Sequence, residues 1–456
     1  MVALLAGRTI LVVGLARSGL AVAEFLWKNG AQTAVSDNRP ASALEAEVRL
    51  LAERGIRYET GGHSRELFDS AELIVVSPGV PLSLPVLQGA AREGRPVISE
   101  IELASWYLKG KTVAVTGTNG KTTTTTLIGD ILRTAGRSVQ VGGNIGRPLV
   151  SLVESSTENS WTVVELSSFQ LEATLTFRPS IAVILNITPD HMDRYVSFDA
   201  YVQAKLNIFR NQASTDFVVL NHEDPNLQNA AATARSAVFW FSRSHPVQRG
   251  VYARSGQLFS QSDGPSERVM ACSEVPLKGS HNLENVAAAI AAARLAGVSP
   301  DVIAEGVRNF KAVEHRLEPV AEVDGVWFFN DSKATNVDAT LKALEAFESG
   351  VVVILGGRDK GGDFKALVQP LQQRAKSVIL LGEASGKIRA QLEGAVPLTQ
   401  AESIGDAVRL AFQEAASGDT VLLAPACASF DMFQNYEHRG REFKAAVARL
   451  QVTGRT

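Results

Sequence analysis

The stretch TVAVTGTNGKTTTTTLIGDIL, residues 112–132, is the strongest indication of the fold of this chain. Its β-branched run predicts a strand that ends at Thr116, and a glycine-containing loop then leads into a helix that opens at Lys121. Glycines let main-chain N–H groups turn toward an anion, and the helix N-terminus adds the positive end of its dipole. Lys121 supplies a cation, and the Thr122 hydroxyl can ligate magnesium. We therefore predict a phosphate-binding loop at residues 117–123, although Val115 stands where the usual GxxxxGK[ST] spacing has its first glycine.

The segments on both sides of this loop repeat its pattern of strand and helix. Short β-branched runs that close on Gly, Asn, Asp or Thr alternate with stretches of helical period along the chain, which is typical of parallel sheets covered by helices. We therefore predict the α/β class throughout. Residues 242–268 are rich in Ser, Gly and Gln and predict loops and short hairpins. The predicted strands are residues 9–13, 33–36, 73–77, 112–116, 161–166, 181–186, 217–220, 326–329, 351–355, 377–381 and 420–424.

Two positions look like domain boundaries, one at residues 102–111 after a Pro/Gly-rich segment and one at residues 309–318. The chain has 456 residues, which at about 150 residues per domain also indicates three domains. We predict domains at residues 1–105, 106–312 and 313–456.

The charge balance excludes a protein made to coat nucleic acid. Lys and Arg total 45 against 48 Asp and Glu, a net charge of -3, so no general positive field exists. The apolar runs end short of the roughly 18 residues that span a bilayer. Two cysteines, Cys272 and Cys427, cannot form a disulfide framework and fit a reducing compartment. We expect a soluble cytoplasmic protein with neither nucleic-acid nor membrane partners.

Two further predicted strands end on groups that a magnesium site would use. Glu165 lies near the end of one strand, and His191 follows another in a turn between Asp190 and Asp193. The carboxyl ends of parallel strands line one crevice, so these groups should meet the phosphate-binding loop there. A solvated strand-end carboxylate and a structural histidine are the alternatives.

Lys205 stands out in the helical stretch SFDAYVQAKLNIFRN, because it shares an inward face with Tyr201 and Ile208. One interpretation is snorkelling, in which the stem covers apolar surface and the ammonium reaches water. The other is that burial lowers the pKa of Lys205, so that a neutral amine reacts with carbon dioxide to give a carbamate able to bridge metal ions.

The N-terminal segment VVGLARSGLA resembles a dinucleotide fingerprint only loosely. Gly14 and Gly19 are present, but Ala16 replaces the middle glycine, so a pyrophosphate of NAD would not approach closely. Asp37 ends the next predicted strand.

Seven dispersed motifs, taken together, resemble those of the Mur ligases, ATP-dependent amide-forming enzymes of peptidoglycan precursor synthesis. The resemblance covers essentially the whole chain and is strongest with the branch of the family that adds D-glutamate. The motifs are GTNGKTT at 117–123, VVELSSFQLE at 163–172, NITPDHMDRY at 186–195, SHNLENVAAAI at 280–290, HRLE at 315–318, NDSKATN at 330–336 and LLAPACASFDMFQNYEHRG at 422–440.

The resemblance implies a Rossmann-like N-terminal domain for a UDP-sugar, a central P-loop ATPase domain and a Rossmann-like C-terminal domain for the amino acid. It implies that ATP phosphorylates the carboxylate of UDP-N-acetylmuramoyl-L-alanine, and that D-glutamate attacks the acyl phosphate. Two Mg²⁺ sites and a carbamylated Lys205 are the implied cofactors, and we expect a monomer.

The same resemblance implies a role for each matching residue. The ATP site would comprise Gly117, Thr118, Asn119, Gly120, Lys121, Thr122, Thr123, Asn282, Asn285, Arg316 and Asp331. The UDP-substrate site would comprise Leu15, Ala16, Arg17, Ser18, Asp37, Arg39, Gly79, Asn144, Ser167, Gln170 and His191. The amino acid would meet Lys360, Ser429 and Tyr436. Thr122 and Glu165 would hold one metal, and His191 with carbamylated Lys205 a second. The catalytic residues would be Lys121, Glu165, His191, Lys205 and Lys333.

Several of these roles have alternatives. Asn282 also reads as a helix N-cap, and Arg316, Asp331 and Lys333 as surface charges. Arg358 competes with Lys360 as the basic group for the amino acid. Cys427 is expected to be packing rather than a nucleophile.

Rival functions remain as well. A GTPase switch would need an NKxD motif, which is absent, and a nicotinamide oxidoreductase would rest on the N-terminal domain alone. A sister ligase or a folylpolyglutamate synthase shares the central machinery and is the nearest rival.

Overall fold

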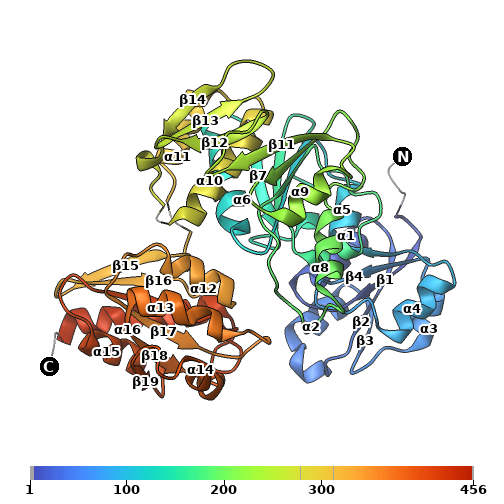
Figure 1. Ribbon diagram of the computed structural model, residues 1–456. Coiled ribbons are helices and arrows are strands. Elements are labelled where there is room, and N and C mark those ends of the chain that lie inside the picture. Colours follow the sequence, from blue (N-terminus) through green and yellow to red (C-terminus); the bar gives the residue numbers. More distant parts are fainter. Residues whose placement is uncertain (1–4, 278, 312, 454–456) are drawn as a thin grey trace.

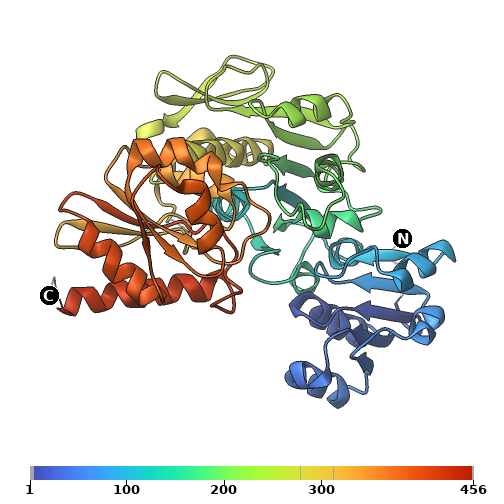
Figure 2. The same ribbon diagram turned by 60° about the horizontal axis from the view of Figure 1, so that its bottom comes forward.

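The computed structural model describes residues 5–277, 279–311 and 313–453, and these form three sheets in succession along the chain (Figure 1). The blue N-terminal domain and the orange and red C-terminal domain lie on different sides of the middle domain (Figures 1 and 2). The predicted α/β class is confirmed. The predicted second boundary falls at residue 312, outside the described residues. No helix in the described ranges is both long enough and apolar enough to cross a membrane.

The N-terminal sheet is wholly parallel, with strand order β3-β2-β1-β4-β5. The strand order reverses beside β1, and the loops at the carboxyl ends there form a crevice, as in doubly wound folds. Its strands are β1 (Thr9–Val13), β2 (Gln32–Asp37), β3 (Arg57–Thr60), β4 (Leu73–Val76) and β5 (Val97–Ser99). Its helices are α1 (Arg17–Lys28), α2 (Glu45–Glu53), α3 (Arg65–Ser70), α4 (Pro85–Arg92) and α5 (Glu100–Ser105), with a 3₁₀ turn at Ala41–Ala43.

The middle sheet has the order β14-β13-β12-β11-β10-β9-β6-β8-β7. It is parallel from β7 to β12, and the last two strands add antiparallel hairpins. Its strands are β6 (Lys111–Thr116), β7 (Val139–Gly143), β8 (Trp161–Glu165), β9 (Ile181–Ile184), β10 (Phe217–Asn221), β11 (Ala237–Ser242), β12 (Gly250–Arg254), β13 (Gln257–Gln261) and β14 (Glu267–Ala271). Its helices are α6 (Lys121–Thr134), α7 (Ser168–Glu172), α8 (Phe198–Leu206), α9 (Pro225–Ala231), α10 (Ser280–Leu295) and α11 (Pro300–Arg308), with 3₁₀ turns at Leu149–Leu152 and Cys272–Glu274.

The C-terminal sheet has the order β15-β16-β20-β17-β18-β19, in which β15 alone pairs antiparallel. Its strands are β15 (Glu318–Val323), β16 (Val326–Asn330), β17 (Val351–Gly356), β18 (Ala375–Leu381), β19 (Leu398–Gln400) and β20 (Thr420–Leu423). Its helices are α12 (Val337–Leu344), α13 (Val368–Arg374), α14 (Ser385–Leu392), α15 (Ile404–Glu414) and α16 (Tyr436–Thr453), with a 3₁₀ turn at Phe364–Leu367.

The two domain boundaries differ in what they bury. One continuous hydrophobic core runs from the N-terminal domain into the middle domain, including Leu26 of α1, Leu103 of α5 and Val150. The C-terminal domain has cores of its own on the two faces of its sheet. None of the hydrophobic clusters found among the described residues joins the middle and C-terminal sheets.

Candidate active site

A cavity of about 470 Å³ lies where all three domains meet. The loop after β4 contributes one wall, the carboxyl ends of β6, β8 and β9 a second, and the C-terminal domain a third. The predicted site residues that line it are Gly79, Thr118, Asn119, Gly120, Lys121, Asn144, Glu165, Ser167, His191, Arg316, Lys333, Lys360, Ser429 and Tyr436. The structure thus brings together residues predicted for five roles: ATP, UDP substrate, amino acid, metal and catalysis.

The phosphate-binding loop connects β6 to α6, as predicted. Gly117 and Gly120 have φ of 150° and 85°, a region that favours glycine. A Cβ on Gly120 would come within 2.1 Å of Asn285 Oδ1, so the close approach of α10 also requires glycine there. Lys121 Nζ donates to the main-chain oxygens of Gly117 at 3.0 Å and Thr118 at 2.7 Å. The ammonium is therefore held directly over the loop.

The Glu165 carboxylate is fixed from both sides. Thr122 Oγ1 donates to Glu165 Oε2 at 2.7 Å, and Asn144 Nδ2 donates to Glu165 Oε1 at 2.8 Å. Arg316, from the segment before β15, donates to Thr122 Oγ1. Glu165 is 1% exposed, so a solvated strand-end carboxylate is excluded.

Lys205 is 2% exposed, on α8 behind the phosphate-binding loop. Its Nζ donates to Gly117 O at 2.7 Å and lies 4.5 Å from the ring centroid of Tyr201. Burial, together with the charge of Lys121, holds the pKa of Lys205 well below its ordinary value. Snorkelling is therefore excluded, because the amine is turned inward and does not reach water.

His191 and Asp190 lie on the turn after β9. His191 has φ of 56°, and burial lowers its pKa against the opposing charge of Asp190. Asp190 faces the C-terminal domain, where its carboxylate contacts Lys360 Nζ at 3.2 Å and accepts from Asn336 Nδ2 at 3.1 Å. The turn therefore contributes a neutral imidazole to the cavity and an anion to the domain boundary.

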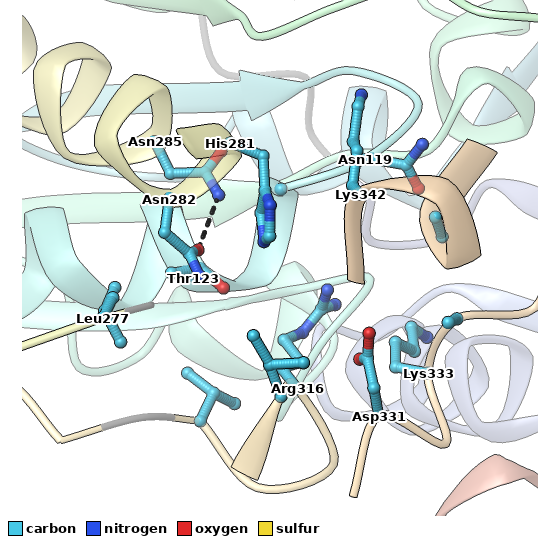
Figure 3. A pocket seen from close by; sticks show the side chains of 15 residues that line it. Asn119, Thr123, Leu277, His281, Asn282, Asn285, Arg316, Asp331, Lys333 and Lys342 are labelled. Atoms are coloured by element: carbon cyan, nitrogen blue, oxygen red, sulfur yellow. Dashed lines mark hydrogen bonds between the residues drawn. The ribbon is translucent and has the colours of Figure 1, made fainter. Parts of the chain in front are cut away.

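A smaller cavity of about 60 Å³ lies between α10 and the C-terminal domain (Figure 3). Its lining includes Thr123, Asn282, Asn285, Arg316 and Asp331, which the resemblance assigns to the ATP site, and Lys333, which it assigns to catalysis. The predicted N-cap role of Asn282 is wrong, because α10 begins at Ser280 with Gly279 at the cap position. Asn282 Oδ1 instead accepts from Asn285 Nδ2 at 3.1 Å.

Asp331 and Lys333 follow β16 and face inward at this boundary rather than lying on the surface. Burial raises the pKa of Asp331 to about 7, against the opposing charge of Arg316. Burial, reinforced by the charge of Arg316, lowers the pKa of Lys333 to about 7. Lys333 Nζ lies 3.7 Å from the ring centroid of Tyr436. Both groups can therefore change charge near neutral pH.

A third cavity of about 520 Å³ lies at the carboxyl ends of the N-terminal strands. Ala16, Arg17, Ser18, Asp37, Arg39 and Gly79, which the resemblance assigns to the UDP-substrate site, line it. Asp37 accepts from Leu15 N at 2.6 Å and from Arg39 Nη2 at 2.9 Å. A Cβ on Gly19 would lie 1.8 Å from Gly14 O, so the glycine serves close helix-to-strand packing.

Five predicted residues lie behind the cavity walls instead of lining them. They are Leu15, Gly117, Thr122, Gln170 and Lys205. Gln170 closes a capping box with Ser167 at the start of α7, which is a structural role that the sequence pattern had not indicated.

Sequence reasoning missed several residues at the domain boundaries. Asp338 of α12 accepts from Asn119 Nδ2 at 2.5 Å and from Thr188 Oγ1 at 3.1 Å. Arg194 donates to the main-chain oxygens of Pro78 and Val80, at 2.9 and 3.3 Å, and so ties the N-terminal loop to the middle domain. Asn336, His63 and His281 also line the cavities. Only contacts between distant segments reveal them.

The two candidate basic residues for the amino acid lie in different surroundings. Lys360 lines the central cavity, whereas Arg358 pairs with Glu383 at 3.1 Å and both of their side chains are more than half exposed. Cys427 is fully buried, and burial raises its pKa to about 12, in agreement with a packing role.

A phosphate-binding loop that faces a buried basic cluster across a domain boundary defines a nucleotide-dependent enzyme. Three domain families match the sequence in order: Mur ligase MurD-like, N-terminal domain at residues 8–99, Mur ligase middle domain at 115–293, and Mur ligase, glutamate ligase domain at 315–427. The chain belongs to the Mur ligase family, and with it to the ATP-dependent ligases.

Curated relatives match nearly end to end. UDP-N-acetylmuramoylalanine–D-glutamate ligase of Acidobacterium capsulatum is 54% identical over 97% of this chain and 96% of its own length. The enzymes of the same name from Koribacter versatilis and Solibacter usitatus are 49% and 50% identical, over 97% and 98% of this chain and 98% and 99% of their own lengths.

Solved structures share the fold at lower identity. A pseudomurein peptide ligase type C from Methanothermus fervidus has a TM-score of 0.62 at 19% identity, covering 97% of this chain and all of that one. The MurF ligase from Thermotoga maritima in complex with ADP has a TM-score of 0.61 at 17% identity, covering 98% of this chain and all of that one.

Proposed function

We propose that this protein joins D-glutamate to UDP-N-acetylmuramoyl-L-alanine, with ATP converted to ADP and phosphate, in peptidoglycan precursor synthesis. The central cavity is the observation that carries the proposal, because a phosphate-binding loop and a basic pocket for an acid face each other across it. The names of the near full-length relatives support this choice of substrates.

Amide formation from a carboxylate requires activation of the acid. An oxygen of the muramoyl-alanine carboxylate attacks the γ-phosphorus of ATP, the bond to the ADP oxygen breaks, and an acyl phosphate forms. This step brings anions together, so catalysis depends on positioning and on positive charge. Lys121 over the loop and Arg316 beside Thr122 supply that charge.

The oxygen-rich surroundings of the loop suit magnesium, a hard cation that prefers carboxylate and hydroxyl ligands. Thr122 and Glu165 already lie 2.7 Å apart and would hold one ion, while His191 and a carbamate on Lys205 would hold a second. Burial lowers the pKa of Lys205 and so favours the neutral amine, which is the form that reacts with carbon dioxide. Such ions would neutralise charge on the transferred phosphoryl group.

The second step needs the amine of glutamate beside the acyl phosphate. Lys360 would hold a glutamate carboxylate in exchange for Asp190, with Ser429 and Tyr436 on the same wall. The amine attacks the acyl carbon, and the tetrahedral intermediate expels phosphate. Lys333 lies beside Tyr436, where a cation would stabilise the developing negative charge.

The N-terminal cavity would hold the UDP end of the substrate through Arg17, Ser18 and Arg39. Gly79 lines both this cavity and the central one, so a single elongated substrate would reach from one to the other. The proposal includes domain limits at residues 105/106 and 312/313, a cytoplasmic monomer, and no nucleic-acid or membrane partner.

The test is ADP release with UDP-N-acetylmuramoyl-L-alanine against a panel of amino acids. We expect turnover with D-glutamate, and transfer of oxygen-18 from the labelled acid into orthophosphate. Turnover with another amine but not with D-glutamate would point to a sister ligase. Orthophosphate without label would overturn the acyl-phosphate route.

A further inference from the structure

A second group of metal-ligating side chains lies outside the three cavities, where two neighbouring parallel strands end. His222 and Glu223 directly follow β10, and His245 comes three residues after β11. Each residue offers one ligand atom, and the three atoms all lie within 4.8 Å of one another. Strand pairing brings the two segments together, because their carboxyl ends share one edge.

Hydrogen bonds orient the Glu223 carboxylate through one of its two oxygens only. Its Oε1 accepts from Ser242 Oγ at 2.6 Å and from Ser244 Oγ at 2.8 Å. Its Oε2 is buried and has no hydrogen-bond partner among the residues that the structure describes. A buried, unsatisfied carboxylate oxygen is unusual in a native protein, and a bound ion is one of its ordinary explanations.

The two imidazoles are also held in place. The His222 ring lies edge-on to Trp240, with centroids 5.5 Å apart, and its centroid is 5.9 Å from that of His245. The main-chain N–H of His245 donates to Ser242 Oγ at 2.8 Å, which folds the residue back toward β10. The side chain of His245 is exposed, so an ion has access from solvent.

A simple ion pair does not account for this arrangement. His245 Nδ1 lies 3.6 Å from Glu223 Oε1, so a protonated His245 would pair with the oxygen that already has donors and leave Oε2 unsatisfied. Among the described residues, Glu223 has no Lys or Arg within ion-pair distance.

The contrast with a similar cluster is informative. Glu314, His315 and Glu318 also meet, but the Lys444 ammonium contacts both carboxylates and Asn330 contacts the imidazole. That cluster already contains the Lys444 ammonium, whereas no Lys or Arg among the described residues pairs with the cluster at β10 and β11.

We propose that His222, Glu223 and His245 bind one divalent transition-metal ion of the Zn²⁺ class. Two imidazoles and a carboxylate are a common zinc ligand set, with water in the fourth position. Ligand atoms in such a site are about 3.4 Å apart, so atoms that now lie up to 4.8 Å apart would close in by up to about 1.4 Å. Ser242 and Ser244 would orient the carboxylate as second-layer partners do.

The proposed ion would fasten the segment after β11 to the end of β10. Arg243 in that segment pairs with Glu284 of α10 at 3.0 Å, and α10 carries the asparagines of the nucleotide cavity. The site is therefore a structural fastening for the middle domain, separate from the magnesium positions proposed above.

The test uses the full chain, stripped with a chelator and held in excess Mg²⁺ so that the phosphate-loop site is filled. Zn²⁺ is titrated by calorimetry, and Co²⁺ is added separately as a probe of tetrahedral coordination by its visible absorption. The variants are His222→Ala/His245→Ala and Glu223→Gln. Asp263→Asn removes an exposed carboxylate of the nearby hairpin and is the matched control.

We expect wild type and Asp263→Asn to bind one more equivalent of Zn²⁺ than the double variant, with micromolar or tighter affinity. Co²⁺ absorption should be lost in both site variants, while the melting temperature of the metal-free forms stays close to that of wild type. Equal stoichiometry in wild type and the double variant would overturn the proposal, and so would binding only at millimolar Zn²⁺.

Discussion

Lys205 is a buried lysine, and its surroundings predict a specific chemical role. Its amine is buried against a main-chain oxygen, and no carboxylate lies within ion-pair distance of it among the described residues. If a carbamate forms there, Lys205→Ala should lower kcat by about two to three orders of magnitude, because the site loses a preorganised charge. A short-chain carboxylic acid in solution should restore part of the activity.

The measurement is steady-state ADP release with and without added acetate. Lys28→Ala, at the exposed end of α1, serves as a control and should keep full activity. Undiminished turnover in Lys205→Ala would rule out the carbamate role.

The protonation state of the Lys333 amine should change when a nucleotide binds. In the free protein its pKa is about 7, so at pH 8 it is mostly neutral. A nearby phosphate raises the pKa of a lysine, so Lys333 should take up a proton as the nucleotide binds at that pH. At pH 6 it is already charged, and the uptake should vanish.

Calorimetry of ADP binding in two buffers of different ionisation enthalpy measures this uptake. Lys333→Arg stays charged throughout and should show a smaller proton uptake at pH 8 than wild type. Identical uptake in wild type and Lys333→Arg would contradict the assignment.

At the scale of elements, helix α5 carries a buried acid at the junction of the N-terminal and middle domains. Glu100 Oε1 accepts from Val150 N at 2.6 Å, while Oε2 has no partner among the described residues. Burial raises the pKa of Glu100 to about 7, although the Val150 N–H opposes the shift. Between about pH 4.5 and 7, the Glu100 carboxyl is therefore mostly protonated in the folded protein and mostly ionised in the unfolded protein.

Because the folded state holds the extra proton, this group favours folding at low pH and the contribution is lost as the pH rises through 7. At pH 8, Glu100→Gln should therefore have a higher free energy of unfolding than wild type, by up to about 3 kcal/mol, and a higher melting temperature. At pH 5 the two proteins should differ little. Melting curves at both pH values test this, with exposed Glu45→Gln as control, and a gap that is independent of pH would refute it.

Elements with a strong local pattern were predictable. The strand, loop and helix at β6 and α6 carry their signal within one continuous stretch, and all eleven predicted strands lie within two residues of observed ones. The hairpins β12 to β14 carry a weaker signal, because they extend an edge where one face is more exposed. The cap interpretation of Asn282 was wrong because local sequence cannot show that the cap position is Gly279, three residues earlier, with α10 beginning at Ser280.

The candidate site was predictable in its composition more than in its contacts. Lys121 and His191 follow strands and Glu165 ends one, and the carboxyl ends of these strands must converge, so the proximity of the three residues was predictable from the fold class. Asp338 and Arg194 act across domain boundaries, and no spacing along the chain encodes those contacts.

At the scale of the whole molecule, the cavity proposed for the nucleotide lies between α10 and the C-terminal domain, so a movement of that domain would change its width. Asp338 joins that domain to Asn119 of the phosphate-binding loop and to Thr188. Asp338→Ala should loosen this docking and raise the radius of gyration, because both partners lose a charged acceptor.

Small-angle X-ray scattering of the free protein checks this prediction, and the KM for ATP should change several-fold in parallel. Glu348→Ala, exposed on the same domain, is the control. An unchanged scattering curve in Asp338→Ala would mean that other contacts dominate the docking.

The contrast between the two boundaries has a thermal consequence. The N-terminal and middle domains share a hydrophobic core, whereas the C-terminal domain contacts the middle domain mainly through polar and charged side chains. Movement of the C-terminal domain away from the middle domain should therefore be accompanied by almost no heat-capacity change. The large positive part of that change comes from apolar area that becomes exposed. An apolar interface would weaken on cooling, but closure of the C-terminal domain should have nearly the same enthalpy at low and at moderate temperature.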